Sequence, residues 1–449
     1  MGIVTTVVCK IFHAFSGWTS GCRISCGLSP RDPHTARAHW STLSNDTDAW
    51  SLQMKISIIS LAILSAVVAF SVQVHAVDKL TVLHSLNPNN GDGSGPTGGL
   101  FMDQAGNLYG GGGASGTIFK LTPDGSGSWT YSVLSNCCAY PLGSFVMDQA
   151  GNLYGTTYFG DVFELTPSGS GSWTATIIFS GQLVSPLIID SAGNLYGQTA
   201  DGGSSNQGFI LELSPNSGGG WSMTDLHDFS GPDGTGGGGA AGIVPGLMMD
   251  SSGDIYGATL RGGAYNDGVV FRLHKSSSGW HEVVLHSFNG TDGLNPDAPL
   301  VMDAAGNLYG TTSAGGANGF GVVFETSRST GTWQTRVLHT FAGLNIDGAY
   351  PNAALLIDAS GNLYGTTAAG GTSNECTVGN ANGCGTAFEL TLHGTHWKET
   401  ILHNFLSKGD GGVPGGVISD ASGKLYGAAL YGGPYNNGGT IFQLTPPAP

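Results

Sequence analysis

One eight-residue motif occurs seven times in this chain and constrains its fold more than any other feature. Every copy reads D-x-x-G-x-[LI]-Y-G, and the copies begin at Asp103, Asp148, Asp190, Asp250, Asp303, Asp358 and Asp420. Successive copies lie about 40 to 60 residues apart, a period typical of propeller blades. An aspartate followed three residues later by glycine favours a tight turn, because the carboxylate accepts turn amides and glycine adopts positive φ. We therefore interpret the seven aspartates as structural turn residues.

Each motif lies within a series of four short apolar runs. A run precedes the motif, a second begins inside it, and a third follows a glycine-rich bend, as in GVVFET from Gly321. The fourth run begins with tryptophan in six units, at Trp129, Trp173, Trp221, Trp280, Trp333 and Trp397. Alternation of apolar and polar residues in these runs predicts half-buried strands, so that each unit is a four-stranded sheet.

The two ends of the repeat array complement each other. The seventh unit stops after its third run, GTIFQLT, whereas the segment from Lys79 to Leu86 repeats the pattern of a fourth run before the first motif appears. Pairing of the two would remove the exposed sheet edges. The sequence therefore predicts an all-β fold, a seven-bladed β-propeller of four-stranded blades whose last blade is closed by the N-terminal strand.

The repeat resembles the GloVer tandem repeat of bacterial surface and secreted proteins. The resemblance rests on GNLYGTT, intact at Gly306 and Gly361, together with runs of the VFELT type, and it extends over residues 77–449. It implies a secreted repeat protein with no established biochemical activity. Members often carry a C-terminal sorting segment, and this chain ends at Pro449 without one, so we expect a released or periplasmic protein.

The N-terminal part differs from the repeats. Residues 54–76 begin with Met-Lys, continue as a long apolar run and end in Val-His-Ala, which predicts a secretory signal peptide cleaved after Ala76. An uncleaved membrane anchor is the alternative, because the apolar run just reaches spanning length. Residues 1–53 share none of the repeat pattern, and we interpret them as an unstructured extension from an upstream start codon. The predicted mature domain is 77–449.

Composition limits the classes of partner. The chain has 31 Asp and Glu against 15 Lys and Arg, which disfavours nucleic acid, since binding its backbone requires clustered cations. We expect no membrane contact after signal cleavage, a monomer, and a polysaccharide or a surface protein as partner.

Four cysteines remain in the predicted mature domain. Behind a signal peptide, Cys376 and Cys384 predict a disulfide that closes a short loop, whose loss the core should tolerate. The adjacent Cys137 and Cys138 are either two free thiols or a vicinal bridge.

Two sets of loops follow the second and fourth strands of each unit and should share one face of a propeller. Candidate ligand-binding residues on these loops are Tyr158, Tyr265, Asn266, Tyr431 and Tyr435. The loops that follow the fourth strands contain Asp-Gly pairs on the same face, at Asp92, Asp233, Asp292, Asp347 and Asp410. Loops held on a rigid scaffold commonly carry function, so this face is the predicted binding surface.

Five histidines recur shortly before these Asp-Gly pairs: His84, His227, His286, His339 and His403. A metal requires several ligands that converge, whereas residues repeated in every blade stand far apart. We interpret these histidines as structural residues that hold the loops by hydrogen bonding, and we assign no catalytic residue, metal or cofactor.

Two functions fit the sequence. The favoured one is a non-catalytic extracellular binding or scaffold module for neutral glycan or a cell-surface polymer. The alternative is a propeller-type polysaccharide hydrolase or lyase with carboxylates in the central channel, where pairs about 5–9.5 Å apart would be expected.

Overall fold

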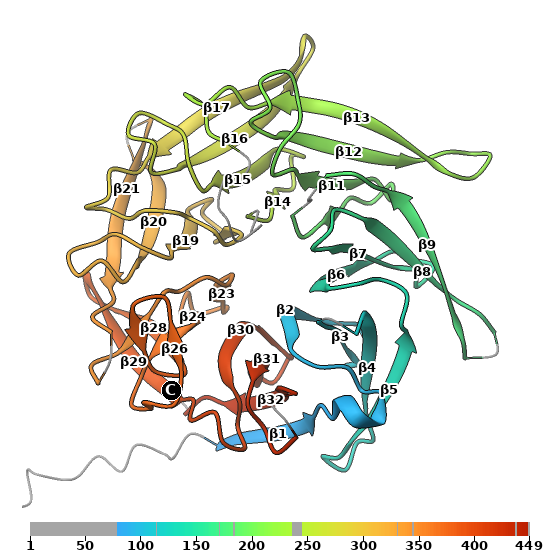
Figure 1. Ribbon diagram of the computed structural model, residues 1–449. Coiled ribbons are helices and arrows are strands. Elements are labelled where there is room, and N and C mark those ends of the chain that lie inside the picture. Colours follow the sequence, from blue (N-terminus) through green and yellow to red (C-terminus); the bar gives the residue numbers. More distant parts are fainter. Residues whose placement is uncertain are drawn as a thin grey trace, which may run out of the picture. The chain divides into compact units, whose positions relative to one another are not determined.

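The computed structural model describes residues 79–447, except 114, 170, 183–184, 236–244, 330, 344 and 436–437. These residues belong to one compact unit, Val74–Pro449. The predicted extension 1–53 and signal peptide 54–76 lie outside the described residues. Seven four-stranded antiparallel sheets are arranged as a ring of blades (Figure 1), so the prediction of an all-β, seven-bladed propeller is confirmed.

The strands of the first four blades follow one another in sequence, from the channel outward. Blade 1 comprises β2 (Pro96–Met102), β3 (Leu108–Gly112), β4 (Thr117–Pro123) and β5 (Trp129–Ser135); blade 2 comprises β6 (Pro141–Met147), β7 (Leu153–Thr157), β8 (Val162–Pro167) and β9 (Trp173–Phe179). Blade 3 comprises β10 (Ile188–Ile189), β11 (Leu195–Gln198), β12 (Phe209–Pro215) and β13 (Trp221–Asp228); blade 4 comprises β14 (Met248–Met249), β15 (Ile255–Thr259), β16 (Val269–Ser276) and β17 (Gly279–Ser287).

The remaining blades follow the same plan with small additions. Blade 5 comprises β18 (Val301–Met302), β19 (Leu308–Thr312), β20 (Val322–Ser329) and β21 (Thr332–Thr340); blade 6 comprises β23 (Leu356–Ile357), β24 (Leu363–Thr367), β28 (Thr386–His393) and β29 (His396–Asn404). The additions are a 3-10 turn, η1 (Pro88–Asn90), and two short pairs, β22 (Gly348–Ala349) with β25 (Ala369–Gly370) and β26 (Thr377–Val378) with β27 (Ala381–Asn382).

Blade 7 joins the two ends of the described chain. It contains β30 (Gly412–Ser419), β31 (Leu425–Tyr431), β32 (Thr440–Thr445) and, as its outer strand, β1 (Lys79–Ser85). Strand β1 pairs antiparallel with β32 from Lys79 opposite Thr445 to Ser85 opposite Thr440. The predicted closure of the ring by the N-terminal strand is therefore confirmed.

The core consists of clusters that each combine side chains of two neighbouring blades. Between blades 4 and 5, Phe288 and Phe324 are buried with their ring centroids 5.0 Å apart. Phe324 stands opposite Gly310 in the β19–β20 ladder. A Cβ atom on Gly310 would lie 2.6 Å from the Phe324 ring, so the last glycine of the repeated motif makes room for the phenylalanine of the next strand.

The repeated aspartate anchors the turn between the first and second strands of each blade. Asp303 Oδ1 accepts the backbone amides of Ala305 and Asn307, both at 2.9 Å, and Oδ2 accepts the Asn307 side-chain amide and the Tyr309 hydroxyl. Gly306 has φ +84°, which explains the fixed glycine. Burial opposes ionisation of Asp303, but these hydrogen bonds outweigh it and lower its pKa.

We expect Asp303→Ala to destabilise the fold by about 1–2 kcal/mol at neutral pH, because the turn loses the acceptor of four hydrogen bonds, most of them partly buried. The pKa of Asp303 is lower in the folded chain than in the unfolded chain, so its contribution is present above about pH 4 and lost as pH falls through the folded pKa. Urea unfolding of both proteins at neutral and acidic pH measures this. A difference that stays equal at both pH values would contradict the interpretation.

Candidate functional site

The tyrosines predicted to bind ligand are exposed but do not form one site. Tyr158 belongs to blade 2, Tyr265 to blade 4, and both Tyr431 and Tyr435 to blade 7. Tyr265 is 64% exposed and has no ring contact among the described residues. Asn266 serves its own turn, because its Oδ1 accepts the Gly262 amide at 3.1 Å.

Tyr158 belongs to a small aromatic cluster that the sequence did not reveal. Its ring lies 6.3 Å from that of Tyr140 and 5.6 Å from that of Phe159, and all three side chains are exposed. Shortly before Tyr140 in the sequence, Cys137 and Cys138 form a vicinal disulfide. Of the two alternatives for these cysteines, the structure contains the bridge.

Cys376 and Cys384 also form a disulfide. Cys384 is fully buried in the cluster between blades 6 and 7, together with Phe405 and Phe442. The expected tolerance to loss of this bridge assumed a loop that stays outside the blades. That assumption is wrong for Cys384, because the loop returns to the core at this residue before β28 begins.

The five recurring histidines lie against the aspartates of the Asp-Gly loops. Nε2 to Oδ2 distances are 2.9–3.3 Å in the pairs His84–Asp92, His227–Asp233, His286–Asp292, His339–Asp347 and His403–Asp410. Asp347 also accepts the amides of Ala342 and Gly343 at 2.7 and 2.9 Å. Each pair therefore joins the outer strand of a blade to the loop that leads to the next blade.

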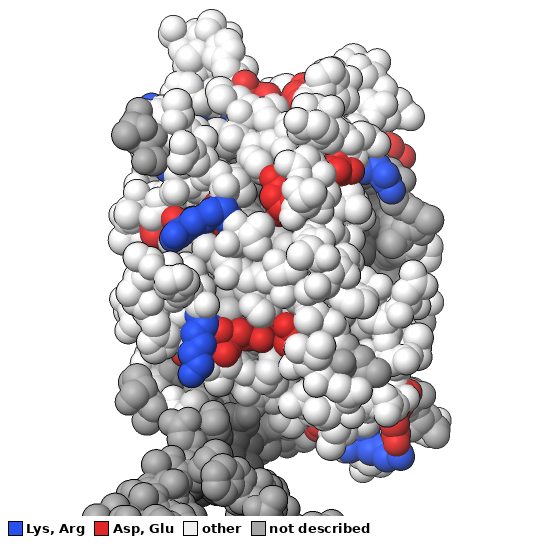
Figure 2. Space-filling model, turned by 90° about the vertical axis from the view of Figure 1, so that its left-hand side faces the viewer, with Lys and Arg blue, Asp and Glu red and all other residues white. Residues whose placement is uncertain are grey.

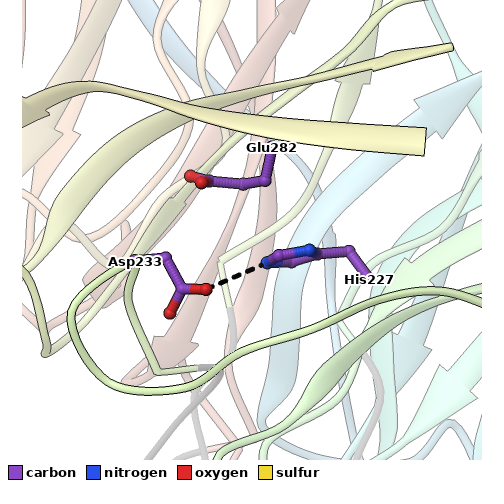
Figure 3. Close-up of side chains that lie close together, drawn as sticks. All are labelled: His227, Asp233 and Glu282. Atoms are coloured by element: carbon purple, nitrogen blue, oxygen red, sulfur yellow. Dashed lines mark ion pairs between the residues drawn. The ribbon is translucent and has the colours of Figure 1, made fainter. Parts of the chain in front are cut away.

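At two blade boundaries, the next blade adds a glutamate to this pair. Figure 3 shows Glu282 of β17 above His227 and Asp233, with its carboxylate directed toward that of Asp233. In the second cluster, Glu399 Oε2 of β29 lies 3.6 Å from His339 Nε2. One ligand atom from each residue of a cluster lies within 4.8 Å of the others. We refer to them as the His227 cluster and the His339 cluster.

Burial dominates the electrostatics of these clusters. Burial and then the neighbouring Asp233 raise the pKa of Glu282 to about 7. Burial also raises the pKa of Glu399 to about 7, with His339 opposing and Asp347 adding to the shift. Sequence reasoning did not assign either glutamate to these clusters, because it considered each histidine within its own blade and not the neighbouring blade. The available signal was position, since each glutamate occurs two residues after the tryptophan of its strand.

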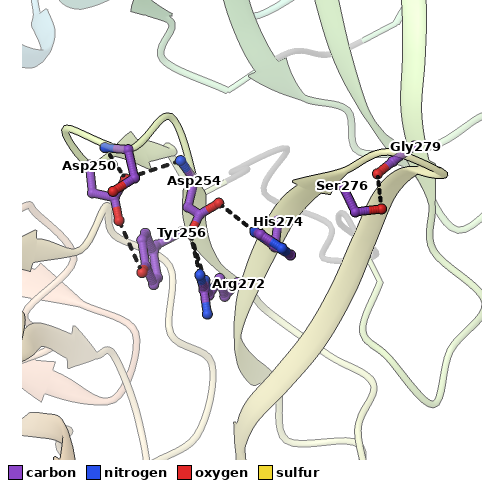
Figure 4. A network of polar contacts seen from close by, with 8 residues as sticks. Asp250, Asp254, Tyr256, Arg272, His274, Ser276 and Gly279 are labelled. Atoms are coloured by element: carbon purple, nitrogen blue, oxygen red, sulfur yellow. Dashed lines mark hydrogen bonds and ion pairs between the residues drawn. The ribbon is translucent and has the colours of Figure 1, made fainter.

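Blade 4 contains a different polar network (Figure 4). Its motif has Asp254 where five other copies have asparagine, and Asp254 contacts Arg272 and His274, the latter at 2.9 Å. Arg272 occupies the position that Glu325 holds in blade 5. Burial opposes ionisation of Asp254, but the His274 and Arg272 hydrogen bonds lower its pKa. The extra carboxylate of Asp254 is neutralised by Arg272, which replaces a glutamate, so we interpret this network as structural.

A hollow of the described surface lies on the opposite face, beside the motif turns. It has a volume of about 550 Å³ and lies between blades 2 and 3, with Asp148, Asn152, Tyr154, Glu164, Asn216 and Trp221 in its lining. The rings of Tyr154 and Trp221 meet edge to face at 5.6 Å. The Tyr154 hydroxyl lies 3.1 Å from Asp148 and 3.2 Å from Glu164. We call this the blade 2–3 hollow.

Related tyrosine and tryptophan pairs recur at other boundaries. Trp129 contacts Tyr426 at 5.7 Å, and Trp397 contacts Tyr309 at 6.3 Å. A second hollow of about 480 Å³ between blades 3 and 4 includes Trp280, but Lys275 covers that ring at 5.3 Å. Sequence reasoning placed binding on the other face because it considered loop length and not the spaces between blades.

Charged side chains are sparse on the surface. On the side of the molecule shown in Figure 2, Lys and Arg lie beside Asp and Glu, and most of the surface is uncharged.

Residues 186–379 match the family model of the Gloeobacter/Verrucomicrobia repeat. This stretch belongs to the Gloeobacter/Verrucomicrobia repeat family. The resemblance inferred from the GNLYGTT motifs is thereby confirmed. The search of curated proteins found no match.

Among solved structures, the repeat propeller is similar to a streptogramin B lyase, with 13% identity, 82% of this chain and 97% of that chain covered, and a TM-score of 0.52. It is also similar to virginiamycin B lyase from Staphylococcus aureus, with 12% identity, 82% and 99% coverage, and a TM-score of 0.52. At these identities the likeness shows the fold alone.

Proposed function

We propose that this repeat protein is a non-catalytic, exported binding module that holds neutral polysaccharide chains in the blade 2–3 hollow. The observation that supports the proposal is the combination in one open concavity of an aromatic pair, Tyr154 and Trp221, with the acceptors Glu164, Asp148 and Asn216. Ligand sites typically combine apolar and aromatic walls with a few polar groups that fix orientation.

The chemistry of a neutral sugar matches these residues. The apolar faces of a pyranose ring can lie on indole, and its hydroxyl groups can donate to carboxylate oxygens. The Tyr154 hydroxyl lies within hydrogen-bond distance of both Asp148 and Glu164. Asp148 also accepts the backbone and side-chain amides of Asn152, so Glu164 keeps the greater acceptor capacity for a sugar hydroxyl. Tyrosine and tryptophan pairs at further boundaries add weak contacts for a long chain, which increases avidity.

Export is part of the proposal. Two disulfides support an oxidising compartment. Within the described residues, no helix is long and apolar enough to span a membrane.

Gel affinity electrophoresis with a panel of soluble neutral polysaccharides tests the function. We expect at least one polymer to retard the wild-type protein. Trp221→Ala should bind a short oligosaccharide of that polymer about tenfold more weakly than the wild type, which corresponds to the loss of one aromatic contact. Trp280→Ala is the matched control, since Trp280 holds the same strand position but is covered by Lys275. Equal loss in both variants, or loss only in Tyr265→Ala, would contradict binding in this hollow.

The same material tests the enzymatic alternative. The described channel-lining strands β10, β14, β18 and β23 contain only Ile, Met, Val and Leu, and β2, β6 and β30 contain no acidic residue. Release of reducing ends or unsaturated products from a bound polysaccharide would overturn the non-catalytic assignment.

A further inference from the structure

The geometry points to two transition-metal sites between blades, one formed by His339, Asp347 and Glu399 and the other by His227, Asp233 and Glu282, each suited to a zinc-class divalent ion. The inference is independent of the proposed glycan function, because the clusters lie on the outer strands and on the loops of the opposite face.

The first argument is convergence. In the His339 cluster, Nε2 lies 3.1 Å from Asp347 Oδ2 and 3.6 Å from Glu399 Oε2. Ligand atoms about 2.0–2.2 Å from a tetrahedral zinc ion lie about 3.3–3.5 Å from one another. The three side chains come from β21, from the following loop and from β29, so an ion there would join two blades.

The second argument is an unsatisfied group in each cluster. Glu399 Oε1 and Glu282 Oε1 are buried, and neither has a hydrogen-bond partner among the described residues. A buried acceptor without a partner destabilises a fold. No described Lys or Arg forms an ion pair with either glutamate. Two carboxylates beside one imidazole therefore lack the cation that this arrangement fits.

The third argument is comparison among blades. Glu282 and Glu399 occupy the same position in the outer strands of blades 4 and 6. The equivalent residues in the outer strands of blades 5, 1 and 7 are Thr335, Tyr131 and Leu80. Tyr131 stacks on His84 with ring centroids 4.1 Å apart. The His–Asp pair therefore forms with or without a glutamate, and the fold does not require this second carboxylate.

The ligand set limits the ion. One imidazole nitrogen with two carboxylate oxygens suits zinc and related transition ions, whereas magnesium and calcium prefer sets made of oxygen alone. His339 is 20% exposed, so an ion and a completing water molecule can reach it from solvent. The sequence-based expectation of no metal rested on the wide separation of the histidines from one another. In the structure, the further ligands beside each histidine are carboxylates.

Isothermal titration of the chelator-treated mature chain, residues 77–449, with zinc, calcium and magnesium chloride tests the inference. We expect two zinc ions per chain and no comparable binding of calcium or magnesium. Glu399→Gln and Glu282→Gln should each lower the number of bound zinc ions per chain from two to one, and the double variant should bind none. Glu325→Gln is the control, because Glu325 pairs with Arg336 at 2.6 Å and belongs to neither cluster.

Thr335→Glu provides a gain-of-site test. It places a carboxylate beside the pair His286 and Asp292, and we expect a third zinc ion per chain. Thermal unfolding without metal shows whether each variant is folded, and added zinc should raise the Tm of the wild type but not of the double variant. Zinc binding that persists in the double variant, or no binding by a folded wild type, would overturn the inference.

Discussion

Deletion of residues 77–86 is expected to abolish cooperative folding of the propeller. The deletion removes β1 and its ladder with β32, so blade 7 becomes three-stranded with an open edge. It also removes Leu86, fully buried between blades 7 and 1, and Leu80, which packs between blades 6 and 7. Full burial of Leu86 contributes about 1.5–3 kcal/mol and the partly buried Leu80 less, against a total stability of about 5–15 kcal/mol.

Calorimetry or urea unfolding measures the effect. The matched control is a chain that begins at Lys79, which retains β1 entire and should unfold like the chain that begins at Val77. An unchanged Tm after deletion of residues 77–86 would refute closure of the ring by this strand.

Gly310→Ala is expected to destabilise the protein by about 3 kcal/mol, at the upper end of the usual cost of overpacking. The added Cβ would lie 2.6 Å from Phe324 and 2.8 Å from Leu300, and both belong to the cluster between blades 4 and 5. The ring cannot move without displacing Phe288, 5.0 Å away.

Gly306→Ala in the same motif is the control. Its Cβ would meet no atom within 4 Å, but the residue has φ +84°, so only the backbone strain of about 1–2 kcal/mol remains. Phe324→Leu should recover part of the stability of Gly310→Ala, because it removes the clashing ring. Equal free energies of unfolding for the two single glycine variants would show that packing against Phe324 does not explain the motif's last glycine.

Cross-blade contacts also explain where sequence reasoning about the site failed. The prediction that His339 holds its loop concerned one blade and the segment that follows it, and the structure places the imidazole against Asp347. Glu399 is about sixty residues further along the chain, and its approach to His339 depends on how blade 6 packs on blade 5. The blade 2–3 hollow arises in the same way, since Tyr154 and Trp221 meet only across a boundary.

The sequence by itself determined the number of blades, the four strands of each and the closure of the ring. These properties follow from periodicity and from local turn chemistry, such as Asp303 with Gly306, which act within one unit. Only the tertiary structure decided which side chains meet between units: the glutamates of the two clusters, the walls of the hollow and the burial of Cys384. The physical reason is that repetition fixes what each blade is, whereas the packing of one blade on the next brings together residues whose separation in sequence carries no periodic signal.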